Sequence, residues 1–316
     1  MNFKSILTCA AAVLVASTLT VRAQSTAGTP EYIKSLTAHW EGERFPDGRP
    51  KVSDNLIERL KKVAIEDAWA ELMKLGYLNQ YEGEWQLVHD DPNACMAGRV
   101  VTAQFMPMRP DLEDAVIEQG KKEGRDWQQK RTVSWVINSL QKGDVYVADT
   151  YDKEWLGTVV GSNLGRGVYN RTGNGLITYG HVRDIEGLRK IEGFNAWTKG
   201  YDPSYMRQTL LVHYNIPIRI GKVTVIPGDV VLAKWGACLF IPAHLVEHIV
   251  LTAEFTGISD EFATDMQNSG KLTAGQVDSV WSPEINKMFM DWAKNYKGKL
   301  PMSLEELERY LKGRNF

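Results

Sequence analysis

The chain of 316 residues contains little cysteine and no strong excess of charge. None of its three cysteines belongs to a Cys-x-x-Cys pair, which makes a thiolate zinc site improbable. The formal net charge is −2, so the composition offers no electrostatic basis for nucleic-acid binding. No Gly-Lys-Ser or Gly-Lys-Thr sequence occurs, which excludes a P-loop for nucleotide phosphates.

Long apolar runs are absent after the first twenty residues. Lys4 precedes a stretch of apolar and small residues over 6–20, and Val21-Arg22-Ala23 has small residues at the two positions that a signal peptidase reads. We therefore expect a signal peptide over 1–23 and an exported protein, periplasmic or secreted. The run is too short and too rich in Ser and Thr to span a membrane, so no membrane association is expected after cleavage.

Export would leave two cysteines, Cys95 and Cys238. They could pair in an oxidising compartment, but a chain of this length can stabilise itself through its core. Two buried free thiols are therefore expected.

The remaining sequence predicts an α/β protein. Residues 24–50 are rich in Ser, Thr, Gly and Pro and are expected to form a leader that wraps around the protein or extends away from it. Ser53 is a good N-cap for a helix that Gly76 can end. Residues 100–106 form an apolar stretch typical of a buried strand.

Helices and strands alternate through the middle of the chain. The charged stretch 111–131 predicts a solvated helix and loop, and 132–140 a helix that leads into a strand over 144–149. Alternation continues to Ile191, and 209–241 is rich in strand-forming residues. Residues 255–316 are expected to be a helical extension, with a capping box at Ser303-Leu304-Glu305-Glu306.

Residues 161–184 hold the most chemically informative pattern. Gly161-Ser162-Asn163-Leu164 predicts the start of a helix, whose backbone N–H groups attract carboxylate or phosphate. After a short apolar strand, Arg183 could neutralise developing negative charge and Asp184 could hold a hard metal ion through oxygen. Together these groups could polarise a 2-oxo acid and stabilise its enolate.

The order of several such motifs resembles the RraA-like family. They are a Gly-Asp-Val strand, the Gly-x-x-Leu helix start, a Gly-x-x-Arg-Asp turn, and a Pro-Gly-Asp-Val strand pair that ends in Ile-Pro. In this chain they are 143–149, 161–164, 180–184, and 227–233 with 239–242. Val52-Ser53-Asp54 also fits the family's first helix start. The resemblance covers roughly residues 50–250.

The resemblance implies a fold and an activity. It implies a swivelling β/β/α domain over 51–254, and the family includes metal-dependent 4-hydroxy-4-methyl-2-oxoglutarate aldolases and the ribonuclease regulator RraA. The implied activity is a carbon–carbon lyase of the class II pyruvate aldolase type. Its substrate would be a small 4-hydroxy-2-oxo acid cleaved through a pyruvate enolate, with oxaloacetate decarboxylation as a side activity. Family members assemble as homotrimers or hexamers.

The resemblance also implies roles for individual residues. Asp184 would hold Mg²⁺ or Mn²⁺, and Arg183 would be the catalytic group that stabilises the enolate. Gly161, Ser162, Asn163 and Leu164, with Arg183, would bind the substrate, whose 1-carboxylate would lie on the amides of 162–165.

Ser162 departs from the pattern of the catalytic members, in which an acidic residue occupies this position. A hydroxyl can hydrogen-bond a metal-bound water but brings no charge to the cation. Asp149 and Asp152 are candidates for the missing acid. His181 would project to the same side as Arg183 on an extended backbone and could act as an acid or base, or be a buried histidine with a hydrogen bond.

Two further patterns have structural interpretations. Gly157, Gly161 and Gly165 recur at every fourth residue, which predicts one closely packed helix face. His244-Leu245-Val246-Glu247-His248 matches the His-x-x-Glu-His string of zinc metallopeptidases, in which both histidines bind the metal. An amphipathic outer helix with both histidines near solvent is the alternative interpretation of that string.

Three functions are therefore carried forward. The first is the metal-dependent aldolase acting on a small 2-oxo acid. The second is a non-catalytic RraA-like binding or regulatory protein, which Ser162 favours and Asp184 disfavours. The third is the zinc metallopeptidase.

Overall fold

The computed structural model describes residues 25–125 and 132–313 of the chain. The expected signal peptide and the last part of the charged stretch 111–131 lie outside these residues. Within them, nine strands form one mixed sheet in the order β1-β11-β10-β3-β4-β5-β6-β2, with β7 pairing alongside β3. The strands of this sheet are β1 Tyr81–Glu82, β2 Gln86–Leu87, β3 Cys95–Pro107, β4 Asp144–Asp149, β5 Leu176–Val182, β6 Ala196–Tyr201, β7 Thr209–Tyr214, β10 Val230–Lys234 and β11 Ala237–Ile241.

The four central strands β3 to β6 run parallel to one another, and the outer pairs are antiparallel. The predicted strand 144–149 is confirmed as β4, and the strand-rich region 209–241 is confirmed as β7 to β11. The carboxyl ends of β4, β5 and β6 therefore meet at one edge, where ligands commonly bind in sheets of this kind.

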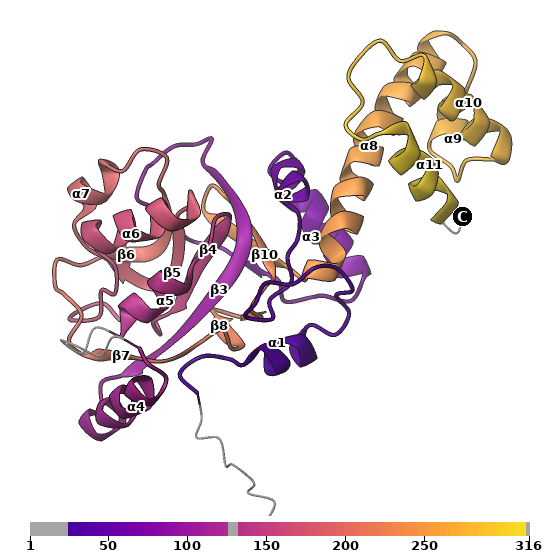
Figure 1. The fold of residues 1–316 in the computed structure, drawn as a ribbon. Helices are drawn as coiled ribbons and strands as arrows, with labels where there is room; N and C mark the ends of the chain where they lie inside the picture. The colour runs from indigo at the N-terminus through magenta and orange to yellow at the C-terminus, as the bar shows by residue number, and fades with distance from the viewer. Residues whose placement is uncertain (1–24, 126–131, 314–316) are drawn as a thin grey trace, which may run out of the picture.

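Helices cover one face of the parallel strands (Figure 1). This face buries side chains from β3 to β5 against α4 Pro110–Lys122, α5 Val133–Ser139, α6 Ser162–Thr172 and α7 Ile185–Arg189. The other face packs on a separate hairpin of β8 Ile218–Ile220 and β9 Val223–Val225. Because side chains of a strand alternate between faces, Tyr146 and Ala148 belong to the first core and Val145 and Val147 to the second.

The helix predicted from Ser53 to Gly76 is two helices, so that prediction was wrong in its interior. Ser53 caps α2 Asp54–Leu60 by accepting a hydrogen bond from the Leu56 N–H, and α3 spans Ile65–Lys74. Between them, the Val63 carbonyl accepts from Lys234 Nζ (2.6 Å), and the Lys61 carbonyl contacts Cys95 Sγ (3.6 Å). These two carbonyls therefore contact side chains from the sheet instead of accepting hydrogen bonds from the N–H groups of a continued helix.

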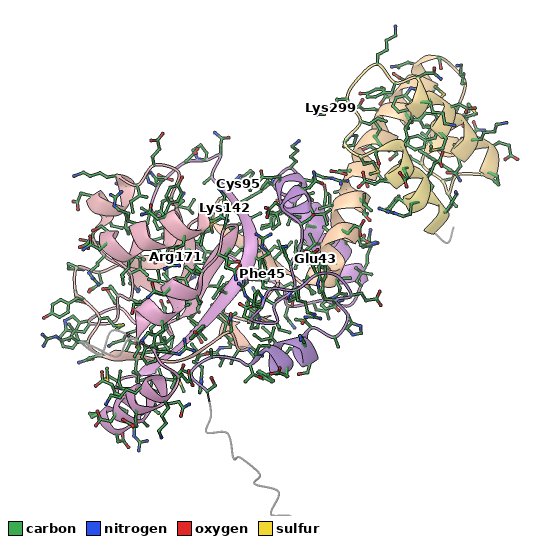
Figure 2. The ribbon with its side chains drawn as sticks, viewed as in Figure 1. Glu43, Phe45, Cys95, Lys142, Arg171 and Lys299 are labelled. Atoms are coloured by element: carbon green, nitrogen blue, oxygen red, sulfur yellow. The ribbon has the colours of Figure 1, made fainter. Side chains whose placement is uncertain are left out.

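The leader wraps onto the domain. It contains α1 Pro30–Leu36, and its Arg49 side chain is fully buried, with Nη1 and Nη2 each 3.0 Å from the Asp144 carboxylate at the start of β4. The ring of Phe45, labelled in Figure 2, lies 5.0 Å from the guanidinium of Arg49 and 5.4 Å from that of Arg99. Burial lowers and the Asp144 charge raises the pKa of Arg49, with a net upward shift.

A helical region follows the sheet. It consists of η2 Ala243–Leu245, α8 Val246–Asn268, α9 Ala274–Val277, α10 Pro283–Lys294 and α11 Leu304–Gly313. In Figure 1, α8 leaves the sheet and carries the later helices away from it. These helices enclose their own core around Phe255, Phe262 and Phe289. The predicted capping box is confirmed by paired hydrogen bonds between Ser303 and Glu306.

Both described cysteines are free thiols, as predicted. Cys238 is buried, but Cys95 is exposed, so the expectation of two buried thiols was wrong for Cys95. Across residues 25–125 and 132–313, no helix is long and apolar enough to cross a membrane.

Candidate active site at the carboxyl edge of the parallel strands

Arg183 and Asp184 directly follow β5 and lie beside the start of α6. Ser162 donates to Asp184 Oδ2 twice, from its backbone N–H (3.3 Å) and from its hydroxyl (3.4 Å). Asp184 has φ = 57°, a left-handed conformation that few residues other than Gly, Asn and Asp adopt. This backbone turn directs the carboxylate toward α6, and the side chain stays 48% exposed.

Gly161 provides the space for this approach. A Cβ atom there would come within 2.5 Å of Asp184 Oδ2 and 3.0 Å of Arg183 Nε. The absence of a side chain at Gly161 therefore allows the loop after β5 to pack closely against the start of α6.

Arg183 is held in place from two directions. Its Nε lies 3.7 Å from Asp184 Oδ2, and its Nη1 donates to the Thr158 carbonyl (3.1 Å). Three quarters of the side chain is buried, which leaves the guanidinium with a defined orientation and further N–H donors.

The first turn of α6 presents two unpaired amides. The Ser162 N–H donates to Asp184, and the Gly165 N–H donates to the Gly161 carbonyl (2.8 Å). The N–H groups of Asn163 and Leu164 have no hydrogen-bond partner in the described part of the chain. The predicted anion cradle over 162–165 is thus reduced to Asn163 and Leu164.

The glycine repeat does not form one helix face. Gly157 lies in the loop before α6, so the prediction was wrong for that residue. The β-branched residues Thr158, Val159 and Val160 separate it from the helix in a buried, extended stretch. Gly165 does serve close packing, because a Cβ there would lie 2.4 Å from the Leu188 side chain.

His181 lies on β5 and packs against the Gly200 backbone of β6. Its Nδ1 is buried, lies 3.9 Å from Asp152 Oδ1 and has no hydrogen-bond partner among the residues that the structure describes. The expectation of a hydrogen-bonded buried histidine is therefore not met at this nitrogen.

The two candidates for the missing acid differ in availability. Asp149 is buried and accepts from the Tyr151 N–H and from Gln104 Nε2, so its carboxylate is committed to the fold. Asp152 is 52% exposed and contacts His181. Neither forms a hydrogen bond or ion pair with Arg183 or Asp184.

Asp202 was missed from the sequence. It follows β6 as Asp184 follows β5, and its N–H donates to the Val182 carbonyl (3.1 Å). Hydrogen bonds from the Ser204 hydroxyl and backbone N–H lower the pKa of Asp202. A polar residue directly after a parallel strand was the signal that could have indicated it.

These donors suit a loosely held, hydrated cation better than a closed metal site. Asp184 Oδ1 has no hydrogen-bond partner in the described residues, and Ser162 contributes a hydroxyl. Within those residues, no group of three or more His, Cys, Asp or Glu side chains could hold a metal ion. Mg²⁺ often binds one or two carboxylates and keeps several waters, so this set can fit such an ion.

The His-x-x-Glu-His string does not form a metal site. His248 Nε2 lies 2.8 Å from Glu71 Oε1, and Glu247 pairs with Arg309 (3.1 Å). His244 lies in η2, with Nε2 3.3 Å from the Tyr77 hydroxyl and its ring 5.2 Å from the tilted ring of His39. Because the three side chains have different partners, the outer-helix interpretation fits the structure and the peptidase interpretation does not.

Solved structures resemble this fold. RraAS2 of Streptomyces coelicolor, described as an unusual member of the RNase ES inhibitor RraA protein family, is 26% identical with a TM-score of 0.56; the alignment covers 68% of this chain and 98% of RraAS2. An uncharacterized protein from Pseudomonas syringae pv. tomato str. DC3000 is 17% identical with a TM-score of 0.55, covering 75% of this chain and 98% of its own.

A third structure, described among novel cellulases from microbes associated with the gut ecosystem, is 18% identical with a TM-score of 0.55. The alignment covers 72% of this chain and 95% of that one. At this identity the likeness concerns the fold alone. The family model RraA-like, described as Aldolase/RraA, matches residues 50–235. This chain therefore belongs to the RraA-like family.

Proposed function

We propose that this protein is an exported, metal-dependent carbon–carbon lyase that cleaves a small 4-hydroxy-2-oxo acid. Oxaloacetate decarboxylation, which passes through the same pyruvate enolate, would be a second activity. The observation that supports this most is the close approach of Ser162 to Asp184, with Arg183 beside them. It brings a carboxylate, a guanidinium and free amides to one edge of the sheet.

The divalent ion would be Mg²⁺ or Mn²⁺, held by Asp184, with the Ser162 hydroxyl toward its water shell. When bound, such an ion supplies Lewis acidity toward the 2-oxo group. The missing acid at position 162 would make its affinity low.

The protein groups would share the remaining work. The N–H groups of Asn163 and Leu164 would bind the 1-carboxylate at the positive end of α6. Arg183 would donate to the 2-oxo oxygen and stabilise its negative charge while the C3–C4 bond breaks. His181 is our candidate for taking the 4-hydroxyl proton, since its imidazole can accept and return a proton.

The test is pyruvate release from oxaloacetate and from 4-hydroxy-4-methyl-2-oxoglutarate, with Mg²⁺, with Mn²⁺ or with EDTA. We expect metal-dependent release that EDTA abolishes. The proposal fails if no 2-oxo acid in a small panel yields pyruvate.

A non-catalytic binding protein is the second candidate. Ser162 in place of the acid, and 26% identity to a member of an RNase ES inhibitor family, favour it. Absence of pyruvate release together with absence of Mg²⁺ or Mn²⁺ binding by calorimetry would support this alternative.

We also propose a homotrimer or hexamer, in which an acidic residue of a neighbouring copy could complete the site around Asp184. Light scattering of the purified protein gives the mass. A monomer that retains metal-dependent activity would contradict a shared site.

A further inference from the structure

A cavity of about 1150 Å³ lies at the opposite edge of the sheet from Arg183 and Asp184. It opens between the start of α3, the beginning of β3 at Cys95 and the turn from β10 to β11. Figure 2 labels Cys95 at this end of β3, beside α2. None of the residues assigned to the candidate active site lines this cavity.

Large apolar side chains are exposed in the cavity lining. Trp69 is 41% exposed, Leu78 60% and Trp235 65%. Neither Trp69 nor Trp235 donates an indole hydrogen bond within the described parts of the chain. Exposed tryptophans gathered around one cavity are typical of a binding site, because the ring offers a flat apolar face and one polar donor.

The backbone at Trp235 has a conformation that is unusual for tryptophan. Trp235 has φ = 55°, a conformation that is unfavourable for a bulky residue. Its carbonyl accepts a hydrogen bond from Trp197 Nε1 (2.7 Å), which anchors the turn to the buried core. Strained positions of this kind cluster at functional sites.

The cavity also carries an excess of positive charge. Lysines at 61, 62, 222 and 234 line it, against the single acidic side chain Glu66. Lys61 pairs with Glu58 (2.6 Å), but Lys62, Lys222 and Lys234 have no carboxylate within 4.0 Å among the described residues. Lys234 Nζ donates to the Val63 carbonyl (2.6 Å), but within 25–125 and 132–313 no carboxylate neutralises any of these three ammonium groups.

We propose that this cavity binds an aromatic carboxylate. The carboxylate would interact with the ammonium groups of Lys62, Lys222 or Lys234, and the ring would contact Trp69 and Trp235. The volume of about 1150 Å³ lies slightly above the range of small-molecule sites, about 300–1000 Å³, so the cavity has room for an aromatic ring system. This site is separate from the proposed lyase centre and does not depend on it.

Isothermal titration of the full chain with 2-naphthoate tests the proposal. The neutral 2-naphthylmethanol and the ringless acetate separate the contributions of charge and ring. We expect 2-naphthoate to bind at least about tenfold more tightly than either analogue, a difference of about 1.4 kcal/mol. Equal affinity for the acid and the alcohol would overturn the assignment to an anionic ligand.

Variants locate the site. Trp235→Asn, which suits the left-handed backbone, and Lys62→Ala should each weaken 2-naphthoate binding by about fivefold or more. Trp155→Ala and Lys299→Ala are the matched controls, since Trp155 is 59% exposed and Lys299 lies in the distant helical region (Figure 2). Pyruvate release should be the same in all four variants and the parent protein.

Cys95 gives a readout that needs no variant, because it is an exposed thiol in the cavity lining. Saturating 2-naphthoate should slow its alkylation by N-ethylmaleimide at least threefold, as measured by peptide mass mapping. Binding without protection of Cys95 places the ligand elsewhere and overturns the proposal. Absence of binding also overturns the proposal, and a Trp235-dependent self-association seen by light scattering would instead identify this surface as an interface between copies of the chain.

Discussion

At the scale of single residues, Arg183 and Asp184 could be predicted together from the Gly-x-x-Arg-Asp pattern. Their relation to Ser162 could not, because it depends on the left-handed backbone of Asp184 and on a contact between segments 22 residues apart. The buried, unpartnered Nδ1 of His181 was also beyond the sequence, which does not show that β6 provides a glycine beneath the imidazole.

The first prediction concerns these two side chains. Arg183→Ala and Asp184→Asn should each lower turnover on oxaloacetate by at least about a hundredfold, as loss of a key electrostatic group does. Steady-state kinetics with saturating Mg²⁺ measures this. Asp111→Asn is the control, because Asp111 forms an exposed ion pair with Arg109 on α4. Unchanged turnover in folded Arg183 and Asp184 variants would remove both residues from the site.

The second prediction concerns Asp229, where burial raises the carboxyl pKa to about 7 and the hydrogen bond from the Ile226 N–H opposes the shift. In the unfolded chain the pKa of this group is about 3.9. The folded state therefore binds more protons between about pH 4 and pH 7, so its contribution to stability falls over that range as pH rises and is constant above it.

Asp229→Asn removes this titration. The free energy of unfolding of the variant minus that of the parent protein should be larger at pH 8 than at pH 5. Urea unfolding at both pH values measures this difference. Asp111→Asn is the control, because Asp111 is exposed and its hydrogen bond with Arg109 lowers its pKa. For this variant the difference from the parent protein should be the same at both pH values. An unchanged difference for Asp229→Asn would contradict the raised pKa.

At the scale of elements, strands and helices with strong local signals were predicted correctly. Ser53 capped its helix and 144–149 formed a strand, buried on both faces, because side-chain capping and a short apolar run are local properties. The break between α2 and α3 was missed because no Gly or Pro marks it. It arises from tertiary partners, Cys95 and Lys234, that take the carbonyls of Lys61 and Val63.

The third prediction tests the close approach of two elements. Gly161→Ala places a Cβ against Asp184 and Arg183 and should reduce turnover by about tenfold to a hundredfold through displacement of these groups. Gly167→Ala in α6 is the control. A Cβ there makes only an ordinary contact with Ile137 (3.5 Å) and should stabilise the helix by up to about 1 kcal/mol. Equal kinetics in both variants would show that the approach at Gly161 is not needed.

At the scale of the whole molecule, composition and alternation were enough to predict an α/β domain with a helical end. The family pattern implied a domain over 51–254, and its boundary remains a prediction. The structure shows that α8 runs through residue 254 without interruption. Neither the buried Arg49–Asp144 pair nor the Arg59 contacts were predictable, since both join residues far apart in the sequence.

The fourth prediction concerns Arg59, which joins α2 to α8 and α11. Its guanidinium pairs with Glu254 (2.6 Å) and Glu306 (2.8 Å), and the side chain is only 14% exposed. Arg59→Ala should lower the free energy of unfolding by about 1.5–3 kcal/mol, the range for hydrogen bonds to charged groups. Urea denaturation measures this.

Arg309→Ala is the matched control for Arg59→Ala. Arg309 also links α11 to α8, but its pair with Glu247 is exposed on both sides. Such pairs contribute about 0–1 kcal/mol, so the effect should be small. Equal losses of unfolding free energy in the two variants would show that the partial burial of Arg59 does not strengthen its ion pairs.

One helix belongs to two cores. The first turns of α8 pack with the sheet through Val246, Ile249 and Val250, and its later turns pack through Phe255, Ile258 and Phe262 with the terminal helices. At 23 residues it is a rod about 35 Å long, so a tilt of ten degrees at one end moves the other by about 6 Å. A displacement of the terminal helices is therefore transmitted along α8 to the part of the sheet that packs against its first turns.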